Sequence, residues 1–120
     1  MNTQQAYENV RAYFTRPGAE LATVAVEEGA LECVYRGDDD PASPLRCAAG
    51  SIIPDEEYRP EFEGKSALSI WQAVPTFRDS EIDRHFLTAA QEAHDGSSYV
   101  AQFVGLLDNL AAEFGLEVIS

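Results

Sequence analysis

Apolar residues recur at the spacing of an α-helix in four stretches of the chain. Each stretch begins at a residue that can cap a helix and ends at a proline or a glycine. We therefore predict helices over residues 3–14, 66–74, 80–94 and 98–114. Their predicted caps are Asn2 or Thr3, Ser66, Ser80, and Ser97 or Ser98. The predicted buried residues lie on the apolar faces of three of these helices: Tyr7, Val10, Phe14, Ile82, Phe86, Leu87, Ala90, Ala93, Phe103, Leu106, Leu107, Leu110 and Phe114.

Between the first two helices the pattern changes to alternation, which is typical of a half-buried strand. Residues 31–36 alternate, with Leu31, Cys33 and Tyr35 on one face. Residues 37–44 are rich in Gly, Asp and Pro and predict a loop, after which residues 45–47 return as a paired strand. Residues 21–26 fit a strand or a helix. We therefore predict one domain over residues 1–120, of the α+β class, mostly helical, with a small antiparallel β-hairpin around residues 31–47.

Charge narrows the function classes. The chain has 8 basic and 21 acidic residues, a formal net charge of −13. This balance argues against direct nucleic-acid binding through phosphates and against an anionic membrane surface, and it suits a protein partner with a basic face. No apolar run approaches the roughly 20 residues of a membrane span, and the N-terminal segment has no pattern of a signal peptide. We expect a cytoplasmic monomer or homodimer with reduced thiols.

The middle of the chain carries a particular string of residues. It reads Cys33-Val-Tyr-Arg36, Arg46-Cys-Ala-Ala-Gly50, Ile53-Pro-Asp-Glu-Glu-Tyr58 and Pro60-Glu-Phe-Glu-Gly64, and Gln91-Glu-Ala-His-Asp95 follows later. This pattern resembles a family of small uncharacterised proteins from bacteria and their phages. The resemblance covers most of the chain and implies no activity. An origin in phages or mobile elements would suit an inhibitor or modulator of a host enzyme that handles nucleic acid.

One set of residues suggests catalysis by a thiol. Cys47, His94 and Asp95 are candidates for nucleophile, base and orienting group, and Cys47 precedes a stretch that can form a helical turn. Against this, His94 and Asp95 are neighbours, and adjacent residues of a helix do not face each other. In the competing interpretation Cys47 is a small buried residue and His94 ends its helix.

No metal or cofactor is expected. Cys33, Cys47, His85 and His94 lack the spacing of a zinc site, and the two histidines fall on opposite faces of one helix. Calcium-loop spacing is absent from the aspartate run at residues 38–40. The acidic residues of the central string suit the binding of a basic partner: Asp38, Asp39, Asp40, Asp55, Glu56, Glu57, Glu61 and Glu63.

The same carboxylates have a structural interpretation. Arg36 and Arg46 can form ion pairs that tie the acidic segment to the hairpin, and we favour this over an acid–base pair. Taken together, the sequence predicts a small interaction module, and more specifically an inhibitor or modulator of a basic partner that handles nucleic acid. The alternatives are a thiol-dependent enzyme using Cys47, His94 and Asp95, and a structural accessory subunit.

Overall fold

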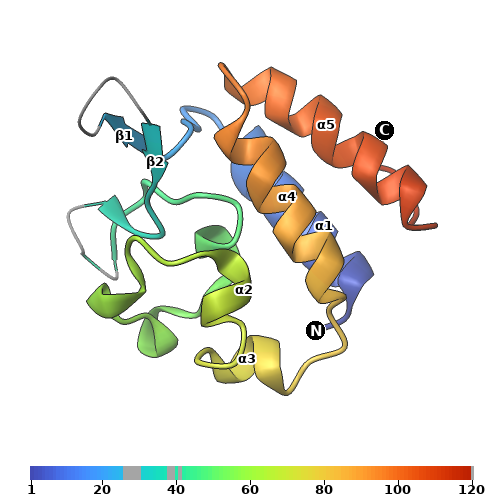
Figure 1. The fold of residues 1–120 in the computed structure, drawn as a ribbon. Helices are drawn as coiled ribbons and strands as arrows, with labels where there is room; N and C mark the ends of the chain where they lie inside the picture. Colours follow the sequence, from blue (N-terminus) through green and yellow to red (C-terminus); the bar gives the residue numbers. More distant parts are fainter. Residues whose placement is uncertain (26–30, 38–39, 41, 120) are drawn as a thin grey trace.

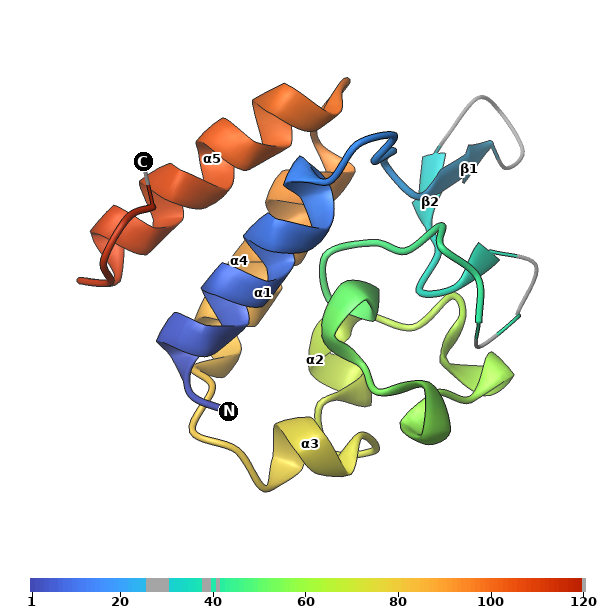
Figure 2. The same ribbon diagram turned by 180° about the vertical axis from the view of Figure 1, so that it is seen from behind.

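The computed structural model describes residues 1–25, 31–37, 40 and 42–119. Three long helices make up one half of it: α1 (Thr3–Thr15), α4 (Arg84–Asp95) and α5 (Val100–Glu113) (Figure 1). Helix α5 packs against both α1 and α4. The other half holds α2 (Ala67–Ile70), α3 (Pro75–Arg78) and three short 3-10 turns, η3 (Gly50–Ile52), η4 (Asp55–Glu57) and η5 (Pro60–Phe62) (Figure 2).

The prediction of an α+β fold is wrong, and the fold is all-α. Strand residues within the described segments are limited to β1 (Thr23–Ala25) and β2 (Leu31–Cys33), which pair antiparallel. In the predicted hairpin, residues 31–36 would instead have paired with residues 45–47. Those segments do lie together, through hydrogen bonds from Gly37 N to the Leu45 carbonyl and from Cys47 N to the Val34 carbonyl.

A ladder between residues 34–37 and 45–47 does not form because a carboxylate takes the necessary donors. The backbone N–H groups of Tyr35 and Arg36 donate to the two carboxylate oxygens of Glu63, at 2.9 and 3.0 Å. A hairpin needs such groups for the strand opposite. The side chain of one distant residue therefore replaces a strand partner.

The predicted start of the first helix is confirmed. Asn2 accepts a hydrogen bond from Gln5 N at 2.8 Å, and Asn2 N donates to the Gln5 side chain at 2.9 Å, which makes a reciprocal capping box. Tyr7, Val10 and Phe14 are buried as expected. Ser66 also caps its helix, accepting a hydrogen bond from Ser69 N, but α2 ends at Ile70.

The predicted starts of the last two helices are wrong. Asp83, not Ser80, caps α4, since its carboxylate accepts a hydrogen bond from His85 N at 2.8 Å. Ser80 instead donates to the Phe77 carbonyl at the end of α3. Pro75, which was expected to end the preceding helix, is the first residue of α3. At α5, the Gln102 side chain accepts from Ser98 N, and neither serine caps the helix.

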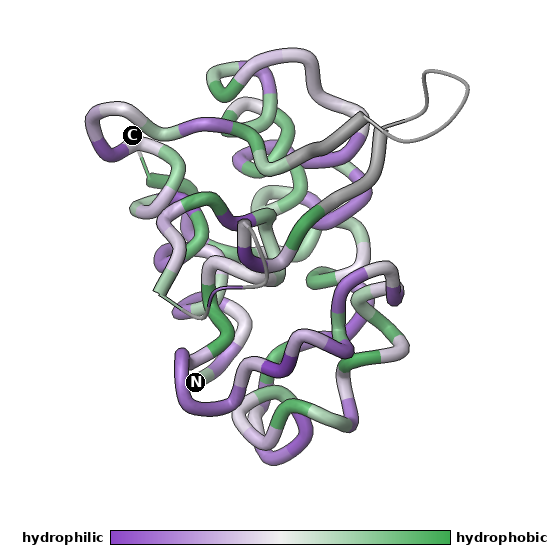
Figure 3. The backbone as a smooth tube through the Cα atoms, turned by 90° about the vertical axis from the view of Figure 1, so that its left-hand side faces the viewer, coloured by the Kyte–Doolittle hydropathy of each residue, from purple (hydrophilic) through white to green (hydrophobic). Residues whose placement is uncertain are grey.

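The buried residues form one cluster that spans both halves of the molecule. At its centre Phe14 of α1 meets Phe103 of α5, with ring centroids 4.9 Å apart. Hydrophobic and hydrophilic residues alternate along the helical segments, as amphipathic helices require (Figure 3). Four predicted buried positions differ: Ala93, Leu110 and Phe114 are only partly buried, and Leu106 is 39% exposed.

Candidate functional site

The last turn of α4 brings together three polar side chains, Gln91, His94 and Asp95. Residues three and four apart on a helix share a face, which places Gln91 beside the other two. The Gln91 amide donates to Asp95 Oδ1 at 2.9 Å, and His94 Nδ1 lies 3.0 Å from the same oxygen. His94 and Asp95 therefore do meet, although they are neighbours in the sequence.

This cluster holds two other segments by their backbone. Ala49 N donates to Gln91 Oε1 at 2.9 Å, and Ala22 N donates to His94 Nε2 at 3.2 Å. A backbone N–H can only donate, so Nε2 carries no proton and the neutral ring must carry its proton on Nδ1, facing Asp95. The His94 ring is fully buried, with Phe14 and Phe103 edge-on to it. Its position is that of a structural clamp.

Cys47 does not join the pair. Its free thiol is fully buried, and within the described part of the chain it makes no hydrogen bond to His94. A thiol nucleophile needs a base nitrogen within reach, and here the Ala22 amide occupies the only unprotonated nitrogen of His94. The helix after Cys47 is the three-residue turn η3, which offers little dipole. Cys47, His94 and Asp95 therefore do not form a catalytic triad in this arrangement.

Arg36 is a second buried polar site, for which the sequence predicted only ion pairs. Its guanidinium is fully buried and donates to the Tyr35 carbonyl at 3.1 Å, to the Ile53 carbonyl at 2.5 Å and to the Gly50 carbonyl. It also pairs with Asp55 at 3.2 Å. Burial, and then the nearby charge of Arg46, lower the pKa of Arg36 from its ordinary value. An arginine stays charged in proteins even so, and it fastens the chain around residues 50–55.

The approach of Gly50 to this centre explains why a glycine stands there. A Cβ added to Gly50 would lie 2.8 Å from the Tyr35 Cα and closer still to the Tyr35 carbonyl oxygen. Real Cβ atoms do not approach backbone so closely. The glycine that ends the Arg46-Cys-Ala-Ala-Gly50 string is therefore required because the backbone passes close to that of Tyr35 at this point.

Several of the predicted partner-binding carboxylates are engaged inside the molecule. Asp55 pairs with both Arg36 and Arg46, each at 3.2 Å, so the ion pairs expected from the sequence are present. The Glu63 carboxylate accepts hydrogen bonds from Tyr35 N, from Arg36 N and, at 2.6 Å, from the Tyr58 hydroxyl. Glu57 accepts from Thr76 N at 2.7 Å and from its hydroxyl at 2.6 Å, which caps α3.

The other predicted residues of this group divide in two. Glu56 and Glu61 are exposed, as is Asp40, which accepts a hydrogen bond from Ala42 N. Asp38 and Asp39 lie outside the described residues.

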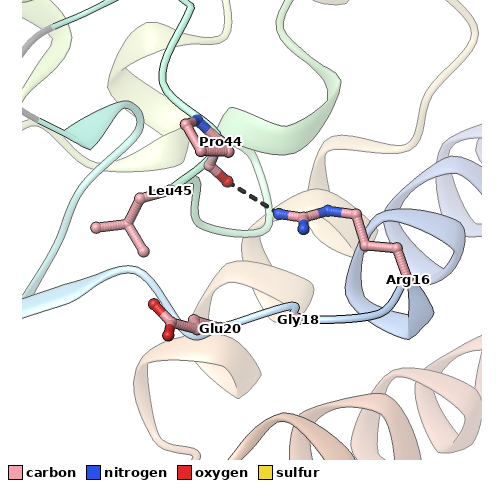
Figure 4. Close-up of a pocket in the computed structure, with 5 residues that line it drawn as sticks. All are labelled: Arg16, Gly18, Glu20, Pro44 and Leu45. Carbon is pink, nitrogen blue, oxygen red and sulfur yellow. Dashed lines mark hydrogen bonds between the residues drawn. The ribbon is translucent and has the colours of Figure 1, made fainter.

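Basic side chains are also turned inward. Arg11 donates to Asp108 at 2.9 Å, and Tyr7 donates to the same carboxylate at 2.6 Å. The hydrogen bond to Asp108 raises the pKa of Arg11, while burial and then Asp108 raise the pKa of Tyr7. Arg16 turns back over the Tyr13 ring and donates to the Pro44 carbonyl at 3.0 Å, beside a small hollow that Glu20 and Leu45 also line (Figure 4).

The surface is consequently more acidic than the composition. Of the 16 acidic side chains that the structure describes, 13 are exposed, against four of the eight basic ones. The exposed basic residues are Arg59, Lys65, Arg78 and Arg84. The exposed acidic ones are Glu8, Glu20, Asp40, Asp55, Glu56, Glu61, Asp79, Glu81, Asp83, Glu92, Asp95, Glu113 and Glu117.

Sequence reasoning missed the structural role of Gln91, and it assigned Glu63 to partner binding rather than to the backbone of Tyr35 and Arg36. The role of Gln91 could have been found, because it lies three residues before His94 and four before Asp95 and can reach each of them on the helix. Glu63 carried no such signal, since its partners lie 27 and 28 residues away.

These sites define a helical protein with an internal polar framework and an acidic exterior. No protein-family model matches the chain, and no curated protein and no solved structure is significantly similar to it. Among the described residues no helix is long and apolar enough to cross a membrane. The resemblance to small bacterial and phage proteins stays a prediction.

Proposed function

We propose that this protein is an interaction module that binds a basic protein partner, and that it modulates or inhibits a partner that handles nucleic acid. The observation that carries the proposal is the division of charge. Exposed carboxylates outnumber exposed cations by 13 to four among the described residues, while Arg36 is buried and Arg11, Arg16 and Arg46 are held against the protein itself.

Such a surface attracts a cationic face at long range. Carboxylates that no local cation neutralises steer a basic partner toward the surface and penalise acidic competitors. A nucleic-acid-binding face is cationic because it neutralises phosphates. An acidic protein that occupies this face excludes the nucleic acid.

The exposed members of the central string, Asp40, Glu56 and Glu61, remain candidates for contact with the partner. Asp55, Glu57 and Glu63 are assigned to the fold instead, since each already serves an arginine, a helix end or a backbone amide. Replacing Glu56 and Glu61 should therefore weaken binding without loss of stability.

Affinity capture tests the proposal. The immobilised protein is exposed to a bacterial lysate, and each retained protein is then purified and titrated alone. We expect a partner with a basic nucleic-acid-binding face, released by salt and displaced by duplex DNA. Exposed charge pairs are screened as the Debye length falls from about 10 Å at 0.1 M to about 3 Å at 1 M salt. Partners that are neutral or acidic, or binding that salt leaves unchanged, would refute it. A partner held permanently without salt dependence would indicate an accessory subunit.

A further inference from the structure

Helices α4 and α5 pack against each other (Figure 1). Side chains of both helices line a groove between them. It is an open depression of about 420 Å³ on the surface rather than an enclosed cleft. Ala89 and Ala93 line it from α4, and Leu106 and Leu110 line it from α5. Leu106 is 39% exposed, although it lies on the apolar stripe of its helix.

The rim of this groove is acidic. Glu92 of α4 and Glu113 of α5 line it, one from each helix, and both are exposed. Neither carboxylate makes a hydrogen bond or ion pair with another described side chain, unlike Asp55 or Glu63. The groove therefore combines an apolar floor with negative charge that the protein does not use.

We propose that the α4/α5 groove binds an amphipathic basic helix of the protein partner. This inference rests on the proposed function, because it names the segment by which the basic partner docks. Leu106 and Leu110 lie four residues apart on α5, and Ala89 and Ala93 four apart on α4, which is the spacing that meets the anchors of a helix lying in a groove. The small alanines leave space for a partner's apolar side chains.

Charge selects the occupant. A helix with Lys or Arg beside its apolar stripe places cations against Glu92 and Glu113. A second copy of this chain would instead bring acidic rims together, at a net charge of −13 on each copy. The groove therefore favours a basic partner over self-association.

Binding of two synthetic peptides tests this. The probe peptide has leucines at positions i, i+3, i+4 and i+7 and lysines elsewhere, and a scrambled peptide of the same composition has no apolar face. We expect the probe to bind more tightly, and its addition to shift the amide signals of the groove residues in an ¹⁵N-labelled sample: Ala89, Glu92, Ala93, Leu106, Asn109, Leu110 and Glu113.

Matched variants separate the groove from general attraction. The double variant Glu92→Gln/Glu113→Gln should weaken the probe by about 2- to 30-fold, which corresponds to the loss of two exposed ion pairs. Glu8→Gln/Glu20→Gln, at two exposed residues that do not line the groove, changes the net charge equally and should weaken it less than about twofold. Leu106→Gln should weaken the probe, while Leu68→Gln, at a residue 55% exposed on α2, should not.

The outcomes distinguish the two proposals. Equal binding of both peptides, with equal losses in the two Glu→Gln pairs, overturns the groove but leaves the acidic surface and the proposed function in place. Absence of binding by either peptide at low salt overturns both. Dimerisation that Leu106→Gln abolishes would also overturn the proposal, since a second copy would then occupy the groove.

Discussion

Replacement of Arg36 by methionine should be among the most destabilising single changes in this chain. The buried guanidinium donates to the carbonyls of Tyr35, Gly50 and Ile53. Arg36→Met leaves these acceptors without that donor in a site with little water. A hydrogen bond that involves a charged group contributes about 1.5–3 kcal/mol, so the loss of three such bonds alone would cost about 4.5–9 kcal/mol.

Two effects reduce the total. The variant no longer buries a charge, which is itself unfavourable, and Asp55, whose side chain is 57% exposed, returns to water. We therefore expect a loss of about 3–5 kcal/mol from the free energy of unfolding, a large part of the roughly 5–15 kcal/mol of a typical domain. Arg36→Lys keeps the charge but lacks the planar fork of donors, and its stability should fall between the two.

Urea unfolding followed by circular dichroism measures this loss. Arg59→Met is the matched control, because Arg59 is exposed, and it should change stability by no more than about 0.5 kcal/mol. A loss below about 1 kcal/mol in Arg36→Met, which is no more than an ordinary point mutation costs, would refute the claim that Arg36 organises the central segment.

Three further changes test other parts of the structure. Gly50→Ala should destabilise the protein by about 1–3 kcal/mol or more, because the Tyr35 backbone occupies the place of the added Cβ. Gly105→Ala, with open space around it in α5, should stabilise the protein by up to about 1 kcal/mol in the same unfolding assay. Equal effects of the two changes would contradict the close approach of Gly50 to Tyr35. Burial and Asp108 raise the pKa of Tyr7, so the folded state keeps a proton that the unfolded chain releases above about pH 10, and stability present below that pH is lost as pH rises. Tyr7→Phe should flatten this alkaline loss, and an unchanged curve of unfolding free energy against pH would count against it. In a Cys33→Ser background, the buried Cys47 thiol should react with iodoacetamide far more slowly in the native state than in denaturing urea; rapid native labelling at neutral pH would restore the thiol-enzyme alternative.

Local signals in the sequence predicted the first helix well, but they predicted the bounds of the later helices less well. Asn2 with Gln5, and the stripe of Tyr7, Val10 and Phe14, were enough to place α1, because capping and helical periodicity act within a few residues. The start of α4 was wrong by one turn, since Ser80 and Asp83 are both good caps and only the end of α3 decides between them.

Long-range side-chain contacts were not predictable from pattern. The alternation over residues 31–36 indicated a strand paired with residues 45–47. Instead, the backbone N–H groups of Tyr35 and Arg36 donate to the carboxylate of Glu63, which directly follows η5. The prediction of ion pairs to Arg36 was confirmed for Asp55, although nothing in the sequence showed that the arginine would be fully buried.

The candidate thiol site shows the same limit. The sequence argued against contact between the neighbours His94 and Asp95, yet the two side chains meet, and Gln91 joins them. That Ala22 N would occupy His94 Nε2 depends on a contact across 72 residues. The motif therefore identified a real polar cluster, but only the tertiary structure shows that it serves as a clamp.

We propose that the acidic surface of this protein recognises a basic partner that handles nucleic acid. The most direct test is the dissociation constant of the purified, captured partner, measured by calorimetry at increasing salt with and without duplex DNA. We predict that the dissociation constant rises about tenfold or more between 0.05 and 0.5 M salt, as surface charges are screened, and that duplex DNA competes for the partner. A dissociation constant that neither salt nor DNA changes would contradict the claim.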